Sequence, residues 1–161
     1  MLIGTQTINT RGHLEIGGCD TLELAREFGT PLYVMDDATI RRHCRDYVRA
    51  FAERYPAGID VHYAGKAFLC LAMCRIIQEE GLSLDVASGG ELYTALKAGF
   101  PPERIALHGN NKSFAELKMA VENGVGRIIV DNFLEFSLLE QLTEGREEPV
   151  SVSVRVAPGI D

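Results

Sequence analysis

The sequence of 161 residues lacks several features that mark whole classes of protein. It has no uncharged apolar run near the roughly 20 residues that a membrane-spanning helix requires, which excludes a membrane span. Its start, Met1-Leu-Ile-Gly-Thr, shows no basic segment followed by an apolar stretch, so we expect no signal peptide. It has no basic excess either, since 16 Lys and Arg stand against 23 Asp and Glu for a net charge of -7. That balance disfavours nucleic acid as a partner and agrees with a cytoplasmic metabolic enzyme.

The four cysteines lack the paired spacings of a zinc site or a disulfide framework. Cys70 and Cys74 are four residues apart and would share one face of a helix, but no Cys or His stands at a spacing that would complete a metal site. We therefore expect no bound metal, and we interpret these two as small apolar residues of a core-facing helix in a reducing compartment. What the chain has in quantity, 46% hydrophobic and 24% charged residues, is typical of a globular domain and excludes a disordered tail.

A strand–helix rhythm runs through residues 59–156. Short apolar runs alternate with segments in which apolar residues recur at i, i+3, i+4 and i+7, the period of an amphipathic helix. The runs predict strands over residues 59–64, 82–87, 104–107, 127–130 and 150–156. Capping boxes at 88–91 and 113–116, and a looser one at 132–135, predict helix starts, and Gly81, Gly99 and Gly124 predict helix ends.

This alternation predicts an α/β fold with a parallel sheet. The polar residues that end the predicted strands follow one another at a nearly even pitch, and they are Lys66, Ser88, His108, Asp131 and Arg155. An even pitch favours a (β/α)8 barrel of the TIM type over a doubly wound sheet. In both architectures the active site lies at the carboxyl ends of the strands, so these residues locate the expected site.

The segment before residue 59 predicts a different organisation. Residues 1–19 predict a β-hairpin of a second β-domain, Asp20 is expected to cap a short helix through Phe28, residues 30–35 predict a strand, and residues 38–55 predict an amphipathic helix. We therefore divide the chain into a lead-in segment, 1–30, partly of a second β-domain, and a barrel segment, 31–161.

An eight-stranded barrel takes about 250 residues, and only about five repeating strands are present here. We therefore expect the chain to be the N-terminal part of a longer enzyme, incomplete at its C-terminus. A partial barrel exposes two sheet edges, so this piece by itself should be sticky, loosely packed or dimeric.

Lys66 is the first candidate for chemistry, because it directly follows an apolar strand in Tyr63-Ala-Gly-Lys-Ala67. Desolvation at such a position disfavours an ammonium and favours the neutral amine that Schiff-base chemistry requires. Lys97, Lys112 and Lys118 do not share this setting. The alternative is a structural lysine that extends to solvent from a strand end.

Three further features fall at the same expected edge. Asp85 is a carboxylate within an apolar strand and needs a partner there. The Ser-Gly-Gly sequence at 88–90 fits either a phosphate site at a helix N-terminus or a plain helix cap, and the polar run 108–113 predicts a lined pocket. Arg155 is expected to face the site or an acid such as Asp85 or Glu91, with solvent as the alternative.

Along nearly its whole length the sequence resembles bacterial diaminopimelate decarboxylases. The resemblance is carried by Tyr63-Ala-Gly-Lys-Ala67, Leu84-Asp-Val-Ala-Ser-Gly-Gly-Glu-Leu92, Gly99-Phe-Pro-Pro-Glu-Arg104 and His108-Gly-Asn-Asn-Lys-Ser113, with flanking Thr30-Pro-Leu-Tyr-Val34 and Arg155-Val-Ala-Pro-Gly159. The run 108–113 is the most specific of these. The lysine motif alone would indicate only the wider alanine-racemase-like family of pyridoxal-phosphate barrels.

The resemblance implies a carboxy-lyase of lysine biosynthesis that uses pyridoxal 5'-phosphate to convert meso-2,6-diaminopimelate into L-lysine and carbon dioxide. Lys66 matches the catalytic lysine that binds the cofactor covalently, and Ala64, Asp85, His108 and Arg155 match positions around the cofactor. A cytoplasmic homodimer is implied as well. Many members have Asn where this chain has Phe68, a departure from which we expect little effect.

The resemblance also implies that later strands supply a histidine stacked on the cofactor ring, a glycine-rich phosphate loop and an acid facing the ring nitrogen. A cysteine and a tyrosine are implied from the opposite subunit. We therefore expect the 161-residue piece alone to bind the cofactor weakly and to be inactive. The alternatives are a related decarboxylase of ornithine, arginine or carboxynorspermidine, and a non-catalytic pyridoxal-phosphate-binding protein.

Overall fold

The structure, a computed structural model, describes residues 2–55 and 57–159. The chain divides into two compact units, Met1–Ile59 and Asp60–Asp161, and each is described by itself. The boundary at residue 30 between a lead-in segment and a barrel segment stays a prediction.

The first unit begins with a small antiparallel sheet that packs beside a helix. Its elements are β1 (Thr7–Ile8), β2 (Leu14–Ile16), β3 (Cys19–Asp20), α1 (Thr21–Phe28) and α2 (Asp37–Ala52). The strands pair in the order β1-β2-β3, so the hairpin predicted over residues 1–19 is present. Asp20 accepts hydrogen bonds from the backbone N–H groups of Leu22 and Glu23, which confirms the predicted start of α1.

The prediction of a strand over residues 30–35 is wrong. This segment has no regular hydrogen-bonded structure, and all six of its residues are exposed. An apolar run becomes a strand only where a neighbouring strand takes up its backbone groups, and no described strand pairs with it. The helix that follows begins at Asp37, one residue earlier than predicted, because Asp36 accepts a hydrogen bond from the Thr39 N–H as its N-cap.

The second unit contains the predicted parallel sheet. Its strands are β4 (His62–Ala64), β5 (Ser83–Val86), β6 (Ile105–Leu107), β7 (Arg127–Val130) and β8 (Val152–Val154). They pair in parallel in the order β4-β5-β6-β7-β8, each strand beside the next along the chain. A doubly wound sheet would reverse its strand order at a switch point, and this sheet does not. The observed order therefore confirms the α/β class and the partial barrel.

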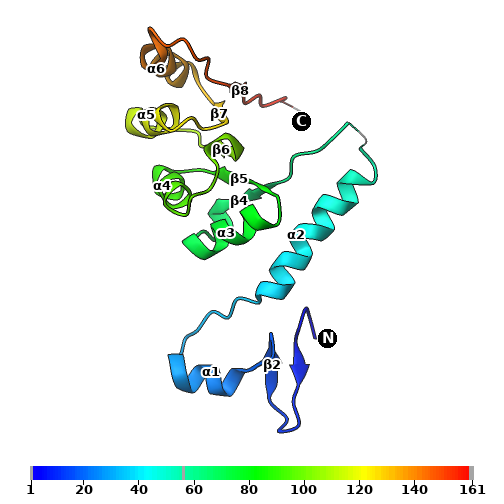
Figure 1. The fold of residues 1–161 in the computed structure, drawn as a ribbon. Coiled ribbons are helices and arrows are strands. Elements are labelled where there is room, and N and C mark those ends of the chain that lie inside the picture. Colours follow the sequence, from blue (N-terminus) through cyan, green and yellow to red (C-terminus); the bar gives the residue numbers. More distant parts are fainter. Residues whose placement is uncertain (1, 56, 160–161) are drawn as a thin grey trace. The chain divides into compact units, whose positions relative to one another are not determined.

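Four helices connect these strands, together with two 3₁₀ turns. They are α3 (Leu71–Glu79), α4 (Gly89–Lys97), α5 (Phe114–Glu122) and α6 (Phe133–Thr143), with η1 (Gly65–Ala67) and η2 (Pro102–Arg104). Figure 1 shows α4, α5 and α6 stacked along one side of the strands. The glycines predicted to end α3, α4 and α5 have φ angles of +80°, +77° and +69°, the left-handed conformation of a helix C-cap.

The core lies between the sheet and the helices. Leu84, Val86, Leu107 and Ile128 point from the strands into this layer and are fully buried. Alternate residues of the same strands face the other way, so the polar side chains of the sheet are gathered on the opposite face. Cys74 is also fully buried from α3, as predicted for a small apolar core residue. None of the helices described is both long and apolar enough to cross a bilayer.

Candidate functional site

A polar cavity of about 200 Å³ opens at the carboxyl ends of the parallel strands, where the sequence places the site. It is lined by Lys66, Asp85, Ala87, His108, Gly109, Asn110 and Arg155. Four of the five predicted site residues are therefore brought together at the carboxyl ends of four strands, β4, β5, β6 and β8. The fifth, Ala64, lies at the end of β4 and is not among the described residues that line the cavity. Gly109 and Asn110 belong to the polar run that was predicted to line a pocket, whereas no sequence signal pointed to Ala87.

Lys66 lies in the turn η1, directly after β4, and its side chain is exposed. The prediction that Lys66 is desolvated is therefore wrong among the described residues. β4 is an edge strand of the described sheet, so another strand flanks it on one side only. What the fold supplies is position rather than desolvation. The preceding Gly65 is buried and close to β5, where a Cβ would stand 3.1 Å from the Asp85 carbonyl oxygen. Close approach at Gly65 thus places Lys66 beside Asp85.

Asp85 carries a carboxylate that is incompletely paired. Its Oδ1 atom is buried and accepts no hydrogen bond within the described structure. The imidazole of His108 lies close to this atom, with Nε2 3.6 Å from Oδ1, which is too long for a hydrogen bond. Burial raises the pKa of Asp85, while His108, His62 and Lys66 act in the opposite direction. A buried acceptor without a donor indicates a place for a polar group of a ligand.

Arg155 follows β8 and contributes its guanidinium to the cavity. Its Nη1 atom lies 3.2 Å from Oδ1 of Asp131, which follows the neighbouring strand β7. Arg155 thus faces an acid, as one alternative predicted, but the acid is neither Asp85 nor Glu91. The backbone of Arg155 is also held at β7, since its N–H donates to the carbonyl of Val130, the residue before Asp131, at 2.9 Å.

The Ser-Gly-Gly turn at 88–90 is a helix cap. Ser88 accepts a hydrogen bond from the Glu91 N–H at 3.2 Å, while the Glu91 carboxylate accepts one from the Ala87 N–H at 2.8 Å. Of the two interpretations of this turn, the structure favours the cap, because Ser88 does not line the described cavity. The cap also fixes the backbone of Ala87 in the cavity wall.

The polar run 108–113 serves two purposes. His108, Gly109 and Asn110 line the cavity, as predicted for the run as a whole. Lys112 instead turns inward and is 5% exposed, so the buried lysine of this chain is Lys112 rather than Lys66. Ser113 caps α5 in a complete capping box with Glu116, which confirms the predicted helix start.

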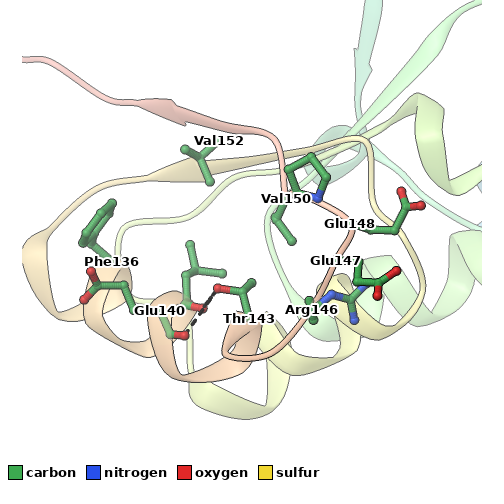
Figure 2. Close-up of a pocket in the computed structure, with 10 residues that line it drawn as sticks. Phe136, Glu140, Thr143, Arg146, Glu147, Glu148, Val150 and Val152 are labelled. Atoms are coloured by element: carbon green, nitrogen blue, oxygen red, sulfur yellow. Dashed lines mark hydrogen bonds between the residues drawn. The ribbon is translucent and has the colours of Figure 1, made fainter.

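A larger hollow, of about 360 Å³, lies elsewhere, between α6 and the chain that leads into β8. Figure 2 shows Phe136, Thr143, Val150 and Val152 around it, with charged Arg146, Glu147 and Glu148 on its rim. The loop that forms it enters β8, so the hollow lies away from the carboxyl ends of the strands. It contains no predicted site residue.

The strand-end cavity fits pyridoxal phosphate in its chemistry. Lys66 supplies an exposed primary amine for the aldehyde, and the unpaired Oδ1 of Asp85 is an acceptor that lacks a donor. His108 and Arg155 add donors on the same rim. These residues would hold the reactive side of the cofactor.

Comparison with known proteins gives the same family. Residues 37–161 match the family model described as pyridoxal-dependent decarboxylase, pyridoxal binding domain. The chain is 52% identical over 158 residues to a diaminopimelate decarboxylase of Halalkalibacterium halodurans and 53% identical over 162 residues to one of Bacillus subtilis. These alignments cover 98% and 99% of this chain and 36% of each relative, so the chain spans about a third of their length.

Solved structures agree. A crystal structure of diaminopimelate decarboxylase from M. jannaschii in complex with L-lysine superposes with a TM-score of 0.85 at 33% identity, covering 98% of this chain and 37% of that one. A lysine/ornithine decarboxylase from Vibrio vulnificus, complexed with putrescine, gives 0.67 at 26% identity, covering 84% and 35%. The predicted fold, cofactor and resemblance are confirmed by these matches. The chain belongs to the family of pyridoxal-dependent decarboxylases, and its residues 37–161 match the pyridoxal-binding domain of that family.

Proposed function

We propose that the full-length protein is a diaminopimelate decarboxylase, which converts meso-2,6-diaminopimelate into L-lysine and carbon dioxide in the last step of lysine biosynthesis. The observation that carries the proposal is the strand-end cavity, where Lys66, Asp85, His108 and Arg155 converge. Identity of 52–53% to diaminopimelate decarboxylases of two bacteria supports this substrate over others. We propose in addition a cytoplasmic location and a homodimer, in line with the acidic composition and the resemblance in sequence.

When bound, pyridoxal phosphate accepts the electron pair that the departing carboxylate leaves on the substrate. Lys66 is the proposed point of covalent attachment. When not bonded to the cofactor, its Nζ would be free to carry a proton to or from the reacting carbon. Its exposed position beside the cavity leaves the side chain room to move between these two tasks.

Asp85, His108, Arg155 and Ala64 are the proposed cofactor-binding residues. The unpaired Oδ1 of Asp85 accepts a hydrogen bond from the ligand, and a donor there relieves the cost of its burial. His108, 3.6 Å from the same oxygen, acts on this carboxylate through charge and lowers its pKa against the larger effect of burial. Arg155 is held by Asp131, so its guanidinium is presented at a fixed angle to an anionic substrate or cofactor group. Ala64 ends β4 with a small side chain, which leaves space beside Lys66.

Reductive trapping tests the covalent assignment. The full-length protein is incubated with pyridoxal phosphate and treated with borohydride, and the labelled peptide is identified by mass spectrometry. We expect a single adduct at Lys66, and no adduct in a Lys66→Ala variant. Lys118→Ala is the matched control, because Lys118 is an exposed lysine of α5 outside the cavity. An adduct scattered over surface lysines would contradict the assignment.

A second candidate is a related decarboxylase of ornithine, arginine or carboxynorspermidine. The similarity to the Vibrio vulnificus lysine/ornithine decarboxylase favours it to a lesser degree, at 26% identity. A non-catalytic cofactor-binding protein is the third. Carbon dioxide release from meso-diaminopimelate, ornithine, arginine and carboxynorspermidine separates the three: we expect release from the first alone. Release from one of the other three substrates but not from meso-diaminopimelate would support the second candidate, and release from none of them, with the adduct present, would support the third.

A further inference from the structure

A buried ion pair contacts the backbone of a residue that lines the strand-end cavity, Gly109. Nζ of Lys112 is 2.8 Å from Oε2 of Glu135, and both side chains are 2% exposed. Lys112 follows β6 and Glu135 lies in the first turn of α6, so the pair joins two successive repeats of the fold. Burying two charges costs several kcal/mol before their attraction is counted, and hydrophobic residues often replace such pairs without loss of stability. The pair therefore calls for a role other than stability.

The hydrogen bonds of Lys112 are directed at backbone groups. Its Nζ donates to the carbonyl oxygen of Gly109 at 2.7 Å and to that of Ile129 at 2.6 Å, in addition to its contact with Glu135. Three acceptors use all three protons of the ammonium group. Gly109 has a φ of +120°, a conformation that other residues rarely adopt. Lys112 thus holds this turn of the cavity wall in its unusual conformation.

Glu135 holds the other side. Its Oε1 accepts a hydrogen bond from the Lys112 N–H at 2.9 Å, and its Oε2 accepts one from the Asp131 N–H at 2.9 Å. Burial raises the pKa of Glu135, but its hydrogen bonds to Lys112 and to the backbone outweigh burial and hold the pKa below its usual value. The carboxylate is ionised and fully engaged at neutral pH.

These contacts lead to two walls of the cavity. Gly109 lies between His108 and Asn110, all of which line the cavity. Asp131 is the residue that pairs with Arg155 at 3.2 Å. One buried pair therefore holds the backbone of the 108–110 turn and that of Asp131, the partner of Arg155, although neither member of the pair lines the cavity itself.

We propose that Lys112 and Glu135 are positioning residues, a buried pair that sets the His108–Asn110 turn and, through Asp131, the Arg155 guanidinium for binding cofactor and substrate. This inference rests on the proposed function for what binds, but the pair and its effect on the turn are testable without it. Loss of the pair shifts groups that contact the ligand, and a misplacement of about 1 Å can cost about a hundredfold in rate.

The test uses the full-length protein with the double substitution Lys112→Met and Glu135→Gln. Removing both charges leaves no uncompensated ion in the core, so the variant is expected to fold. The matched control is Lys118→Met with Glu122→Gln, the same chemical changes in an exposed pair of α5 whose charged atoms are 3.6 Å apart. In cofactor-free protein we expect backbone amides of residues 108–112 and 131 to exchange faster with solvent in the double variant but not in the control.

With cofactor and substrate, we expect kcat/KM to fall by about tenfold or more, and the pH dependence of the bound cofactor's absorption to shift. If the pair were purely structural, its removal would lower thermal stability but leave kcat/KM and the pH dependence of the absorption unchanged in the protein that folds. That result would overturn the proposal. Should the double variant not fold, wild-type exchange decides: rapid exchange of the Lys112 and Asp131 amides in the folded protein would overturn the proposal, and strong protection would support it. A wild-type protein that binds no pyridoxal phosphate would refute the proposed function while leaving the exchange result intact.

Discussion

Oδ1 of Asp85 and Nε2 of His108 lie 3.6 Å apart across the carboxyl ends of β5 and β6, near enough for attraction between charges and too far for a hydrogen bond. The buried oxygen accepts no hydrogen bond from any described group. Asp85 thus lacks a hydrogen-bond donor among the residues that the structure describes. The consequences extend to stability as well as to binding.

Asp85→Asn should stabilise the cofactor-free, full-length protein at neutral pH. Burial raises the pKa of Asp85 above its ordinary 3.8, so the folded protein binds this proton more tightly than the unfolded chain does. Its contribution to the free energy of unfolding is therefore present at low pH and is lost as the pH rises through the raised value. The neutral amide avoids that loss, and we expect a gain of about 1 kcal/mol at pH 7.

Urea denaturation at pH 7 and near pH 4 measures this, and the gain should shrink at the lower pH. Asp46→Asn is the control, because Asp46 is an exposed carboxylate paired with Arg49 on α2. A loss of stability at pH 7 in Asp85→Asn would contradict the prediction, since it would mean that the protein already supplies a partner for the carboxylate.

The sequence was sufficient to predict the order and ends of most elements of the second unit, because short-range signals determine them. Apolar runs define β5, β6 and β7, and the residues that cap and end the helices act within a few positions of the chain. The convergence of Lys66, His108 and Arg155 could be predicted because the carboxyl ends of parallel strands meet at one edge.

What the sequence did not reveal depends on partners distant in the chain. Nothing near Lys112 distinguishes it as the buried lysine, because the carboxylate that makes its burial tolerable is Glu135, 23 residues later. The sequence did not reveal the pair of Arg155 with Asp131 for a similar reason, since β7 and β8 become neighbours only in the folded sheet. The misassigned strand at 30–35 has suitable residues, but no described strand pairs with it.

Asp131→Asn should separate ligand binding from stability. The ion pair with Arg155 is exposed on the arginine side, which is 63% accessible, so its contribution to stability is within about 0.5 kcal/mol. Without it, Arg155 loses its fixed orientation at the cavity. We expect the KM for substrate to rise severalfold while the urea midpoint stays nearly unchanged. Asp46→Asn, which also breaks an exposed ion pair, should change neither; a large loss of stability in Asp131→Asn would show that the carboxylate supports the fold instead.

Ser113→Ala should weaken the start of α5. Ser113 accepts from the Glu116 N–H, and the Glu116 carboxylate accepts from the Ser113 N–H and also from Gly89 at 2.8 Å in the preceding repeat. Loss of an N-cap of this kind costs about 1 kcal/mol in the free energy of unfolding.

The backbone N–H and hydroxyl of Ser113 hold the pKa of Glu116 below its usual value, so this carboxylate stabilises the fold above pH 4.5 and loses that effect as the pH falls. The difference in the free energy of unfolding between Ser113→Ala and wild type, measured by urea denaturation, should therefore become smaller at acidic pH. Ser137→Ala, at an exposed position within α6, is the control and should cost nothing. An equal loss in both variants would exclude the cap as the cause.

Gly126→Ala should be the most damaging of the glycine substitutions outside the turns of positive φ. Gly126 precedes β7 and donates its N–H to the Pro102 carbonyl at 2.9 Å, and a Cβ here would overlap the backbone carbonyl of Glu103. Because backbone rather than a flexible side chain blocks the space, η2 and β7 would have to separate, at a cost of about 3 kcal/mol.

Gly90→Ala is the matched control, because a Cβ there meets only the Ser88 hydroxyl at 3.9 Å. Alanine favours the helix over glycine, so Gly90→Ala should raise the free energy of unfolding by up to about 1 kcal/mol. Urea denaturation measures the free energy of unfolding of both variants. If that free energy changed in the same direction in the two, the close approach of η2 to β7 would not constrain the fold.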